Sequence, residues 1–500
     1  MARTPSAAFD YVIVGAGSAG CVLANRLSAD PERTVLLLEA GGEDDYFWIK
    51  IPVGYLFTIN NPRTDWCFKT EAEPGLNGRA LNYARGKVLG GCSSINAMIY
   101  MRGQRSDYDH WASLGNKGWS WDEVLPCFTR VEDYAHGADE LHGAGGELRV
   151  EERRVSWEIL DAWREAAAEC GIPKIPEFNR GDNFGNAYFQ VNQRRGVRVS
   201  MTTAFLRPIM HRSNLTVVTH AHALGLTLET RDGVRRAMGG RVRTRGGDEV
   251  FAARREVILA AGAIGSPQIL QLSGIGPRRL LQQHDIAVAH ELPGVGENLH
   301  DHLQIRMMYK VRNVATLNER ANSLLGKAAM ALDYLLFRTG PLTMPPSQLA
   351  PSRRAIRGSP RPTSSGTCSR SASTSSASPC TRSRRSRRPC VISDRPAAAT
   401  CGSRARIRLP TPPSGSTTSQ RRKTSASWST PCASPGASWP RARWRSTSPT
   451  SGSPGPGRRR TRSYSTPPAI WARPSSIRSA RAGWDTTRWR SWTIGSGCAA

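Results

Sequence analysis

Two short apolar runs near the start of the chain predict buried strands with a helix between them. Residues 11–14 are apolar and lead into a G-x-G-x-x-G pattern, and residues 21–27 continue with apolar side chains at helical spacing. A second apolar run, residues 34–38, ends in Glu39. This order of strand, glycine turn, helix, strand and acid is typical of a dinucleotide-binding site.

The glycines and the acid of this segment each suit a bound dinucleotide. Gly15 permits the tight turn, and Gly17 lets backbone N–H groups approach a pyrophosphate at the positive end of the helix. Gly20 lets the helix pack close to the strand, and Glu39, 24 residues after Gly15, can accept hydrogen bonds from a ribose. The glycine pattern alone also fits an ordinary tight turn, so the prediction depends on the strands and the acid together.

The hydrophobic pattern predicts further elements along the chain. Residues 157–170 carry apolar side chains at helical spacing, whereas residues 178–198 are rich in glycine, asparagine and aromatic residues and favour loop and strand. Residues 256–263 form a buried strand that runs into a glycine turn. Residues 324–337 predict a helix that ends before Gly340.

The last third of the chain lacks any such pattern. Residues 350–500 contain no Glu, Phe, His, Asn or Met, and their seven Trp are scattered without periodicity. Ser, Arg, Pro, Thr, Ala and Gly dominate, so the segment has too few aliphatic side chains to build a core. We therefore expect residues after about 350 to be disordered.

The net charge of +29 also belongs to this last third. Residues 346–500 hold 29 Lys and Arg but only two acids, Asp394 and Asp485, which gives +27, and the rest of the chain sums to +2. The first part is therefore an ordinary near-neutral globular sequence, with no sign of a nucleic-acid partner.

From cysteine usage and hydropathy we expect a cytoplasmic protein. The eleven Cys form no C-x-x-C pair and no zinc-like spacing with His, so we expect reduced thiols and no metal site. No run reaches the roughly 20 apolar residues that span a bilayer. The first strand begins near residue 10, so we expect no signal peptide. Peripheral association with a membrane is left open.

A glycine-rich segment at residues 85–103 suits a flat or anionic ligand, because Gly90 and Gly91 permit close backbone approach. By composition alone, it also fits a structural turn. The segment resembles the first signature of the glucose–methanol–choline (GMC) flavoprotein oxidoreductases. Residues 262–276 resemble the second signature, and residues 294–302 resemble a third block of the same family. The resemblance covers about residues 8–349, and Cys92 stands where the first signature usually has Gly, Ser or Thr.

The resemblance implies an α/β fold in two parts. One part is a Rossmann-like FAD-binding domain of the glucose-oxidase kind, formed by residues 8–150 and 211–309. The other is an incomplete α+β substrate domain, formed by residues 151–210 and 310–349. Residues 350–500 remain a low-complexity basic segment outside both domains.

The resemblance also implies FAD rather than NAD as the cofactor. The glycine turn and Glu39 would hold its ADP half, Ala223 would contact adenine through its backbone, and the first signature would lie against the isoalloxazine ring. Some members bond the flavin through a His at the position of Ile95, which has no nucleophile, so we expect non-covalent FAD. The cofactor-binding residues implied in this way are Gly15, Gly17, Ser18, Ala19, Gly20, Glu39, Ala40, Arg85, Gly90, Gly91, Ser93, Asn96, Ala97, Met98, Ala223, Gly262, Asp301 and His302.

The family's catalytic base is a His in a C-terminal H-P-x-G-T block, followed by a second His or Asn. Neither exists in this chain as written, so we expect no catalytic residue. His300 and His302 are the nearest substitutes, but they fit better as part of the FAD-packing block.

Three explanations compete for the last third. It can be a natural basic tail that binds nucleic acid, as the arginines of residues 382–388 suggest. It can also be a mucin-like linker or a segment translated out of frame. When the codons of residues 475–481 are read in a shifted frame, they can spell Phe-His-Pro-Val-Gly-Thr, which matches the family's catalytic block. We therefore favour a frameshift near residues 349–351.

The sequence thus predicts a choline- or alcohol-dehydrogenase-like enzyme. It would oxidise a primary alcohol, choline-like or other, to the aldehyde by hydride transfer to flavin N5. The alternatives are a catalytically inactive FAD-binding fragment and a basic-tailed nucleic-acid-binding protein. The alcohol, the oligomeric state and the electron acceptor, a quinone or oxygen, stay open.

Overall fold

The structure is a computed structural model that describes residues 7–299, 301–303, 307–353, 364–365, 367–369, 391–395 and 399–401. The described residues after 348 include five short strands: β20 (Leu349–Arg353), β21 (Ser364–Ser365), β22 (Thr367–Ser369), β23 (Val391–Arg395) and β24 (Ala399–Cys401). The rest of the segment that we expected to be disordered lies outside the described residues, as does His300, so the disorder stays a prediction.

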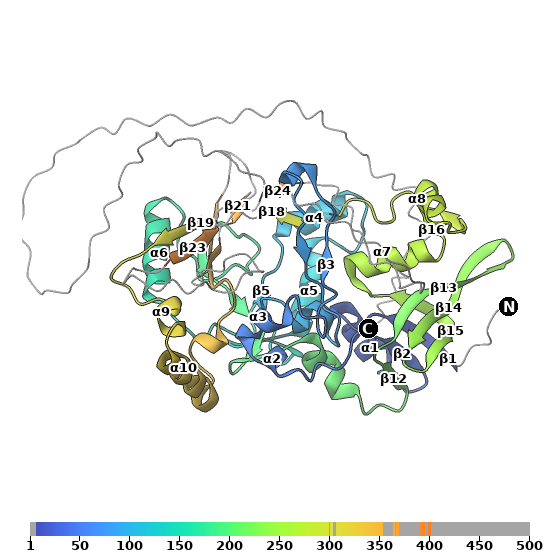
Figure 1. Ribbon diagram of the computed structural model, residues 1–500, viewed down its shortest axis with the longest axis horizontal. Coiled ribbons are helices and arrows are strands. Elements are labelled where there is room, and N and C mark those ends of the chain that lie inside the picture. Colours follow the sequence, from blue (N-terminus) through green and yellow to red (C-terminus); the bar gives the residue numbers. More distant parts are fainter. Residues whose placement is uncertain are drawn as a thin grey trace, which may run out of the picture. The chain divides into compact units, whose positions relative to one another are not determined.

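A six-stranded sheet carries the nucleotide-binding pattern (Figure 1). Its order is β12-β2-β1-β15-β14-β13. The first four strands run parallel, and β14 and β13 complete the sheet in antiparallel fashion. The strands are β1 (Ala7–Val14), β2 (Val35–Leu38), β12 (Leu215–Val218), β13 (His222–Arg231), β14 (Val234–Thr244) and β15 (Gly247–Leu259).

Both faces of β1 and β2 are buried, which explains their continuous apolar runs. On one face, Ile13 and Leu37 pack with Ala24 of helix α1 (Ser18–Leu27). On the other face, Val12 and Leu36 belong to the cluster that includes Ile269 of helix α7 (Gly262–Leu272). Parallel strands covered by helices on both faces show this pattern rather than an alternation of polar and apolar residues.

Short elements fill the chain between β2 and β12. They include the helices α2 (Phe47–Lys50), α3 (Tyr55–Thr58), α4 (Arg105–Ser113), α5 (Trp121–Val131) and α6 (Glu158–Glu169). The strands are β3 (Phe68–Lys69), β4 (Asn82–Tyr83), β5 (Ile99–Tyr100), β6 (Glu132–Tyr134), β7 (Leu148–Val150), β8 (Gly185–Tyr188), β9 (Gln190–Val191), β10 (Gln193–Arg194) and β11 (Val197–Arg198).

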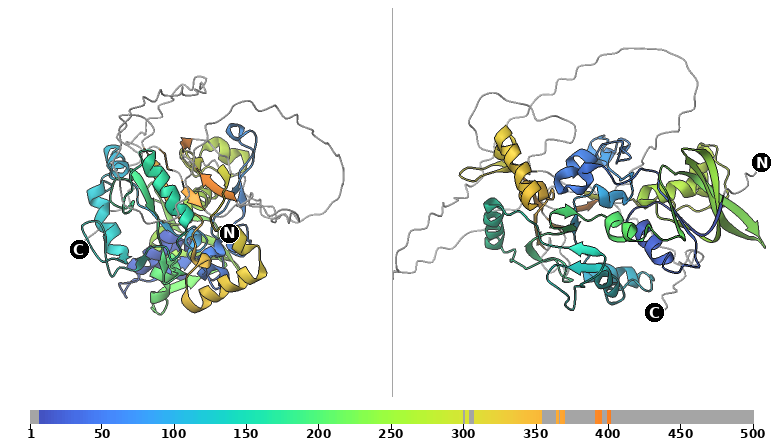
Figure 2. Two further views of the ribbon diagram at one scale, coloured as in Figure 1. Left: turned by 90° about the vertical axis from the view of Figure 1, so that its left-hand side faces the viewer. Right: turned by 90° about the horizontal axis from the view of Figure 1, so that it is seen from below.

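A second sheet has the order β19-β23-β22-β20-β21, and β8 pairs with β20. The elements that follow α7 are β16 (Ile275–Gly276), α8 (Arg278–Gln283), β17 (His290–Glu291), β18 (Asp301–Leu303), β19 (Met307–Lys310), α9 (Leu317–Ala321) and α10 (Leu324–Phe337). Figures 1 and 2 show α9 and α10 side by side. The helices predicted at residues 157–170 and 324–337 correspond to α6 and α10.

Candidate cofactor-binding site

A cavity of about 510 Å³ lies at the carboxyl ends of β1, β2 and β15. Ligands of open α/β sheets bind at this edge. Many of the residues singled out in the sequence line this cavity: Gly15, Gly17, Ser18, Ala19, Glu39, Ala40, Arg85, Gly91, Ala223 and Gly262.

The three glycines of the first turn differ in what a side chain would meet. Gly15 has φ 105°, and a Cβ there would lie 2.6 Å from the carbonyl oxygen of Ala260. A Cβ on Gly20 would lie 1.9 Å from the carbonyl oxygen of Gly15, so α1 packs directly on the turn. At Gly17, the nearest protein atom to a Cβ is 3.9 Å away. The backbone of Gly17 therefore faces open cavity, as a bound pyrophosphate requires.

The amino end of α1 keeps its N–H groups available to a ligand. Gly17 precedes the helix without a side-chain cap, and the first turn of α1 carries no acid. The first N–H groups of a helix have no partner within the helix and attract anions. The cavity thus presents the backbone donors that a diphosphate needs, and the residues present fit the ADP half of a dinucleotide.

Glu39 is fixed at the bottom of this cavity by backbone hydrogen bonds. Its carboxylate accepts one from the N–H of Ala16 at 3.0 Å and one from the N–H of Gly41 at 2.8 Å. Burial raises the pKa of Glu39 to about 7, although both backbone donors and nearby Lys87 act in the opposite direction. The acid is held by both oxygens, and an ionised carboxylate keeps further acceptor sites beyond these two hydrogen bonds, at a residue that lines the cavity.

The first-signature segment closes the cavity against the glycine turn. Gly90 donates its N–H to the carbonyl oxygen of Ala16 at 2.8 Å. A Cβ on Gly91 would lie 2.8 Å from the Cα of Gly17, so the two glycine-rich loops touch. Gly90 and Gly91 both have positive φ, at 84° and 53°. The segment is therefore a cavity wall, and Cys92 lines the cavity with it.

Ser93, Asn96, Ala97 and Met98 continue this wall beyond the cavity itself. Asn96 Oδ1 accepts a hydrogen bond from the N–H of Met98 at 2.9 Å. Met98 is buried with φ 59°. These residues form a tightly bonded turn, but they do not line the cavity.

Asp301 and His302 lie on β18, where both are exposed. Neither is among the cavity-lining residues. Of the third block, none of the residues that the structure describes lines the cavity with the glycine turn and Glu39. His302 is likewise not placed to act on a ligand in this cavity.

An aromatic group at the cavity was not among the residues that the sequence analysis singled out. Trp66 and Phe68 stack with ring centroids 5.5 Å apart, and both line the cavity with His222. Lys87 lies 4.8 Å above the Trp66 ring. The pKa of His222 is lowered, first by burial and then by Lys87 and Arg243. The position of His222 directly before Ala223 was the signal that could have identified it.

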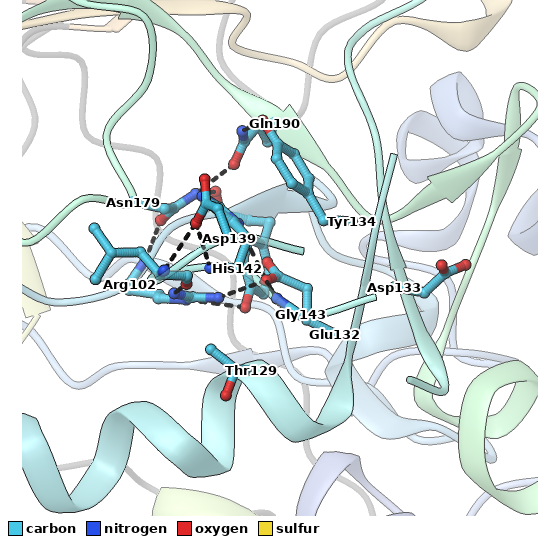
Figure 3. Close-up of polar contacts among 12 residues, drawn as sticks. Arg102, Thr129, Glu132, Asp133, Tyr134, Asp139, His142, Gly143, Asn179 and Gln190 are labelled. Atoms are coloured by element: carbon cyan, nitrogen blue, oxygen red, sulfur yellow. Dashed lines mark hydrogen bonds and ion pairs between the residues drawn. The ribbon is translucent and has the colours of Figure 1, made fainter. Parts of the chain in front are cut away.

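A second buried polar region lies outside the cavity (Figure 3). Glu132 Oε2 accepts hydrogen bonds from Arg102 at 2.8 Å and from the N–H of Gly143 at 2.9 Å. His142 places Nδ1 3.1 Å from Glu132 and Nε2 2.9 Å from Glu177. Because both ring nitrogens face carboxylates, the imidazole is held in its doubly protonated form.

The hydrogen bonds within this cluster determine the pKa of His142. Hydrogen bonds to Glu132 and Glu177 outweigh burial and raise the pKa of His142 to about 9. The ring of Tyr134 stacks on His142 with centroids 4.0 Å apart. Gln190 extends the network by donating to Glu177 at 2.7 Å and to Tyr134 at 2.9 Å. We call Arg102, Glu132, His142, Glu177 and Gln190 the His142 network.

An α/β fold with a pyrophosphate-binding glycine turn and an acid at the end of the second strand defines a dinucleotide-binding protein. Residues 9–304 match the sequence model of the GMC oxidoreductase family, and the chain belongs to that family. The family's members are FAD-dependent flavoproteins, which confirms FAD over NAD and the Rossmann-like fold. Non-covalent attachment and the domain boundaries stay predictions.

Relatives and solved structures agree with this assignment. The chain is 41% identical over 347 residues to the oxygen-dependent choline dehydrogenase of Photobacterium profundum, covering 66% of this chain and 58% of that protein. It is 38% identical over 359 residues to the alcohol dehydrogenase [acceptor] of Pseudomonas putida, covering 70% of this chain and 63% of that protein. The matches therefore span less than two thirds of these curated relatives.

Two oxidases have similar structures. The crystal structure of pyridoxine 4-oxidase from Mesorbium loti has a TM-score of 0.68 and 31% identity, and the match covers 80% of this chain and 75% of that one. Formate oxidase has a TM-score of 0.70 and 25% identity, and the match covers 79% of this chain and 73% of that one.

In the part of the chain that the structure describes, every helix is too short or too polar to cross a bilayer.

Proposed function

We propose that the protein binds FAD non-covalently in the cavity at the carboxyl ends of β1, β2 and β15. We propose also that the form of the protein whose last third is read in frame oxidises a primary alcohol to the aldehyde. The single observation that carries this is the cradle of Gly17, the uncapped start of α1 and buried Glu39 around one cavity. When bound, FAD supplies the redox chemistry by accepting a hydride at flavin N5.

The residues of the chain would divide the cofactor between them. The N–H groups of residues 17–19 would bind the diphosphate, and Glu39 would accept hydrogen bonds from the ribose. The first-signature wall around Gly91 would lie against the flavin ring, and the stacked Trp66 and Phe68 offer flat apolar faces at the same cavity. Asp301 and His302 would complete the site only if β18 approached it.

Two relatives suggest two kinds of substrate. One is named for choline and the other for alcohols with an unspecified acceptor. A choline-like or simpler primary alcohol is therefore the proposed substrate, with a quinone or oxygen as the electron acceptor.

We propose further that this chain lacks the catalytic base. The block expected to supply it can be spelled only in a shifted frame of residues 475–481, which lie outside the described residues. A frameshift near residues 349–351 explains why the cradle is intact while the base is missing. DNA sequencing across those codons in independent clones tests it, because an intact frame across the junction in every clone, with no shift, would remove the version in which the frameshift is a sequencing error.

Purified protein distinguishes the three functions. A flavin absorbance spectrum that is released by acid, without dye reduction by alcohols, supports an FAD-binding chain that lacks its base. Restoring the frame near codon 350 should then give turnover. Colourless protein with salt-sensitive DNA binding would favour the nucleic-acid alternative instead.

Glu39→Gln tests the cradle directly. The amide keeps the size of the side chain but replaces one acceptor with a donor that faces a backbone N–H, so FAD affinity should fall by about tenfold. Glu43→Gln, on the exposed side of the same turn, is the matched control and should bind FAD like the unmodified protein. Flavin fluorescence titration of both variants measures the difference.

We also propose that the protein associates with anionic membrane surfaces through α10. Tyr334 on its inner face is buried, whereas its outer face exposes five leucines, two of them by 85%: Leu324, Leu325, Leu332, Leu335 and Leu336. Exposed Lys327 and Arg338 flank this face, and residues 346–500 add a net charge of +27. An apolar helix face with basic flanks suits an anionic lipid surface.

A further inference from the structure

Arg198 is a buried cation whose partners are all neutral. Its guanidinium donates to the carbonyl oxygen of Ile49 at 3.0 Å and to that of Ser93 at 3.1 Å. It also donates to the Asn96 side-chain oxygen and carbonyl oxygen, each at 2.8 Å. The residue is 2% exposed. Among the described residues, no carboxylate pairs with it, and burial alone lowers its pKa to about 9.

This arrangement is unusual because burying a charge without a counter-charge lowers the stability of the folded protein. Arg102, which is equally buried, shows the ordinary solution, since Glu132 pairs with it at 2.8 Å. Carbonyl dipoles can hold a guanidinium in place, but they do not cancel its charge. A protein that keeps Arg198 in this form therefore maintains a positive potential at this point of its interior.

Two acceptors of Arg198 belong to the turn that continues the cavity wall beyond Gly91 and Cys92, which line the cavity. Ser93 and Asn96 are the two ends of the turn that follows Gly91, and Gly91 itself contacts Gly17 across the cavity edge. The planar fork of the guanidinium ties both ends of this turn to Ile49 of α2. Arg198 thus fixes the turn in place and is not itself among the cavity-lining residues.

We propose that Arg198 is a positioning residue for the flavin: it holds the wall of residues 91–98 rigid and supplies the uncompensated positive charge next to it, which favours the negatively charged, reduced cofactor. This inference rests on the proposed FAD site. It assigns to Arg198 two separable effects, geometry through the fork of donors and electrostatics through the charge.

Two variants separate these effects. Arg198→Lys keeps the charge but loses the fork, and Arg198→Gln keeps hydrogen-bond donors but loses the charge. Fluorescence titration of FAD should show weaker binding in both variants, by about 10- to 100-fold, because charged hydrogen bonds are lost or distorted. The matched control is Arg194→Gln on the neighbouring strand β10, where the arginine is exposed and pairs with Asp133. This control should bind FAD normally.

The reduction potential of the bound FAD, measured against a reference dye, decides the electrostatic part. The Gln variant should shift the ratio of reduced to oxidised flavin about tenfold toward the oxidised form, or about 30 mV for a two-electron couple. The Lys variant should keep the original potential at pH 6. Its potential should then fall more steeply with pH than that of the unmodified protein, because a buried ammonium loses its proton readily.

The outcomes are distinguishable from one another. An unchanged potential in the Gln variant, together with weaker binding, would reduce Arg198 to a structural clamp and overturn the proposal. If the Gln variant does not fold, the pH dependence of the Lys variant decides alone, and a slope identical to that of the unmodified protein overturns the proposal. If the unmodified protein binds no FAD, the proposed function fails instead.

Discussion

The cofactor cavity and the His142 network are built in opposite ways. The end of the cavity at the glycine turn is formed largely by backbone: a turn in which Gly15 and Gly20 have no room for a Cβ, an uncapped helix start, and one acid held by two N–H groups. The His142 network is formed by side chains, with two carboxylates, an arginine and an imidazole sharing buried hydrogen bonds. The first region offers backbone donors to a ligand, whereas in the second most polar atoms bond to one another, and Glu132 Oε1 is left as a buried acceptor without a hydrogen-bond partner.

Because of this difference, different kinds of substitution should damage the two regions. A backbone-built site fails when atoms are added, because nothing can move out of the way. A charge-built cluster fails when a partner is removed, because the remaining charge stays buried and unpaired. The following changes test this contrast, beginning with the largest expected effect.

Adding a side chain at Gly20 should have the largest effect. In Gly20→Val, the new Cβ would lie 1.9 Å from the carbonyl oxygen of Gly15, which is backbone and cannot rotate away. We expect a loss of about 3 kcal/mol or more and no FAD binding. Thermal unfolding and flavin absorbance measure both effects.

Gly246→Val is the matched control for this substitution. It lies in the exposed turn between β14 and β15, where a Cβ would meet no atom closer than 3.5 Å. Its FAD binding should match that of the unmodified protein. Normal FAD binding by Gly20→Val would contradict the close packing of α1 on the turn.

Removing a carboxylate from the His142 network should be next in size. Glu132→Gln takes the negative charge from between Arg102 and His142, and breaking such a buried pair costs about 3–5 kcal/mol. FAD affinity should change little, because Glu132 does not line the cavity. Glu165→Gln, whose partner Lys174 is exposed, is the control and should cost at most about 1 kcal/mol. Urea unfolding followed by tryptophan fluorescence compares the two variants.

The His142 network should also make stability depend on pH, by a smaller amount. The pKa of His142 is raised to about 9 in the folded protein, so its contribution is complete below the unfolded pKa of about 6.5 and is lost as pH rises through 9. The slope is at most about 1.4 kcal/mol per pH unit. The pKa of Glu177 is lowered and that of Tyr134 is raised to about 12, so neither titrates in this window.

Urea unfolding at pH 6.5, 8 and 9.5 tests this dependence. The unmodified protein should lose stability across the series, and His142→Gln should lose less. Equal slopes in the two proteins would show that His142 does not carry the extra proton.

The same contrast explains what the sequence predicted. The glycine turn, Glu39 and the strands β1 and β2 were predictable because a backbone-built site needs glycines at fixed spacing beside apolar runs. The bounds of α10 were also predictable from its apolar pattern. That pattern could not tell which face is buried, and the leucine face points outward.

Other features of the structure, the β13–β14 hairpin and the His142 network, were harder to predict from the sequence. The hairpin of β13 and β14 turns at Asp232 and Gly233, both with positive φ, and this Asp-Gly pair was a usable hairpin signal that periodicity alone overlooked. The His142 network had no such signal, because its members come from residues 102 to 190 without any spacing rule. Only the tertiary fold brings these side chains together.

The outer face of α10 should show the smallest effect on stability. In the double variant Leu335→Gln and Leu336→Gln, both side chains are more than 60% exposed, so unfolding should change by less than about 0.5 kcal/mol per site. Sedimentation with vesicles that contain phosphatidylserine should fall several-fold, since the leucine face would supply the apolar contact. Val234→Gln, an exposed apolar residue at the β13–β14 turn, is the control and should leave sedimentation unchanged.

The same variant separates a lipid surface from self-association. If α10 binds lipid, the unmodified protein should pellet with anionic vesicles, stay in solution without them, and be released by salt, because the basic flanks contribute electrostatically. If the leucine face is instead a surface left uncovered by the loss of an in-frame C-terminal third, the protein should aggregate without vesicles and the double variant should suppress that aggregation. Restoring the frame would then remove the aggregation without any change to α10, a result that the lipid proposal does not survive.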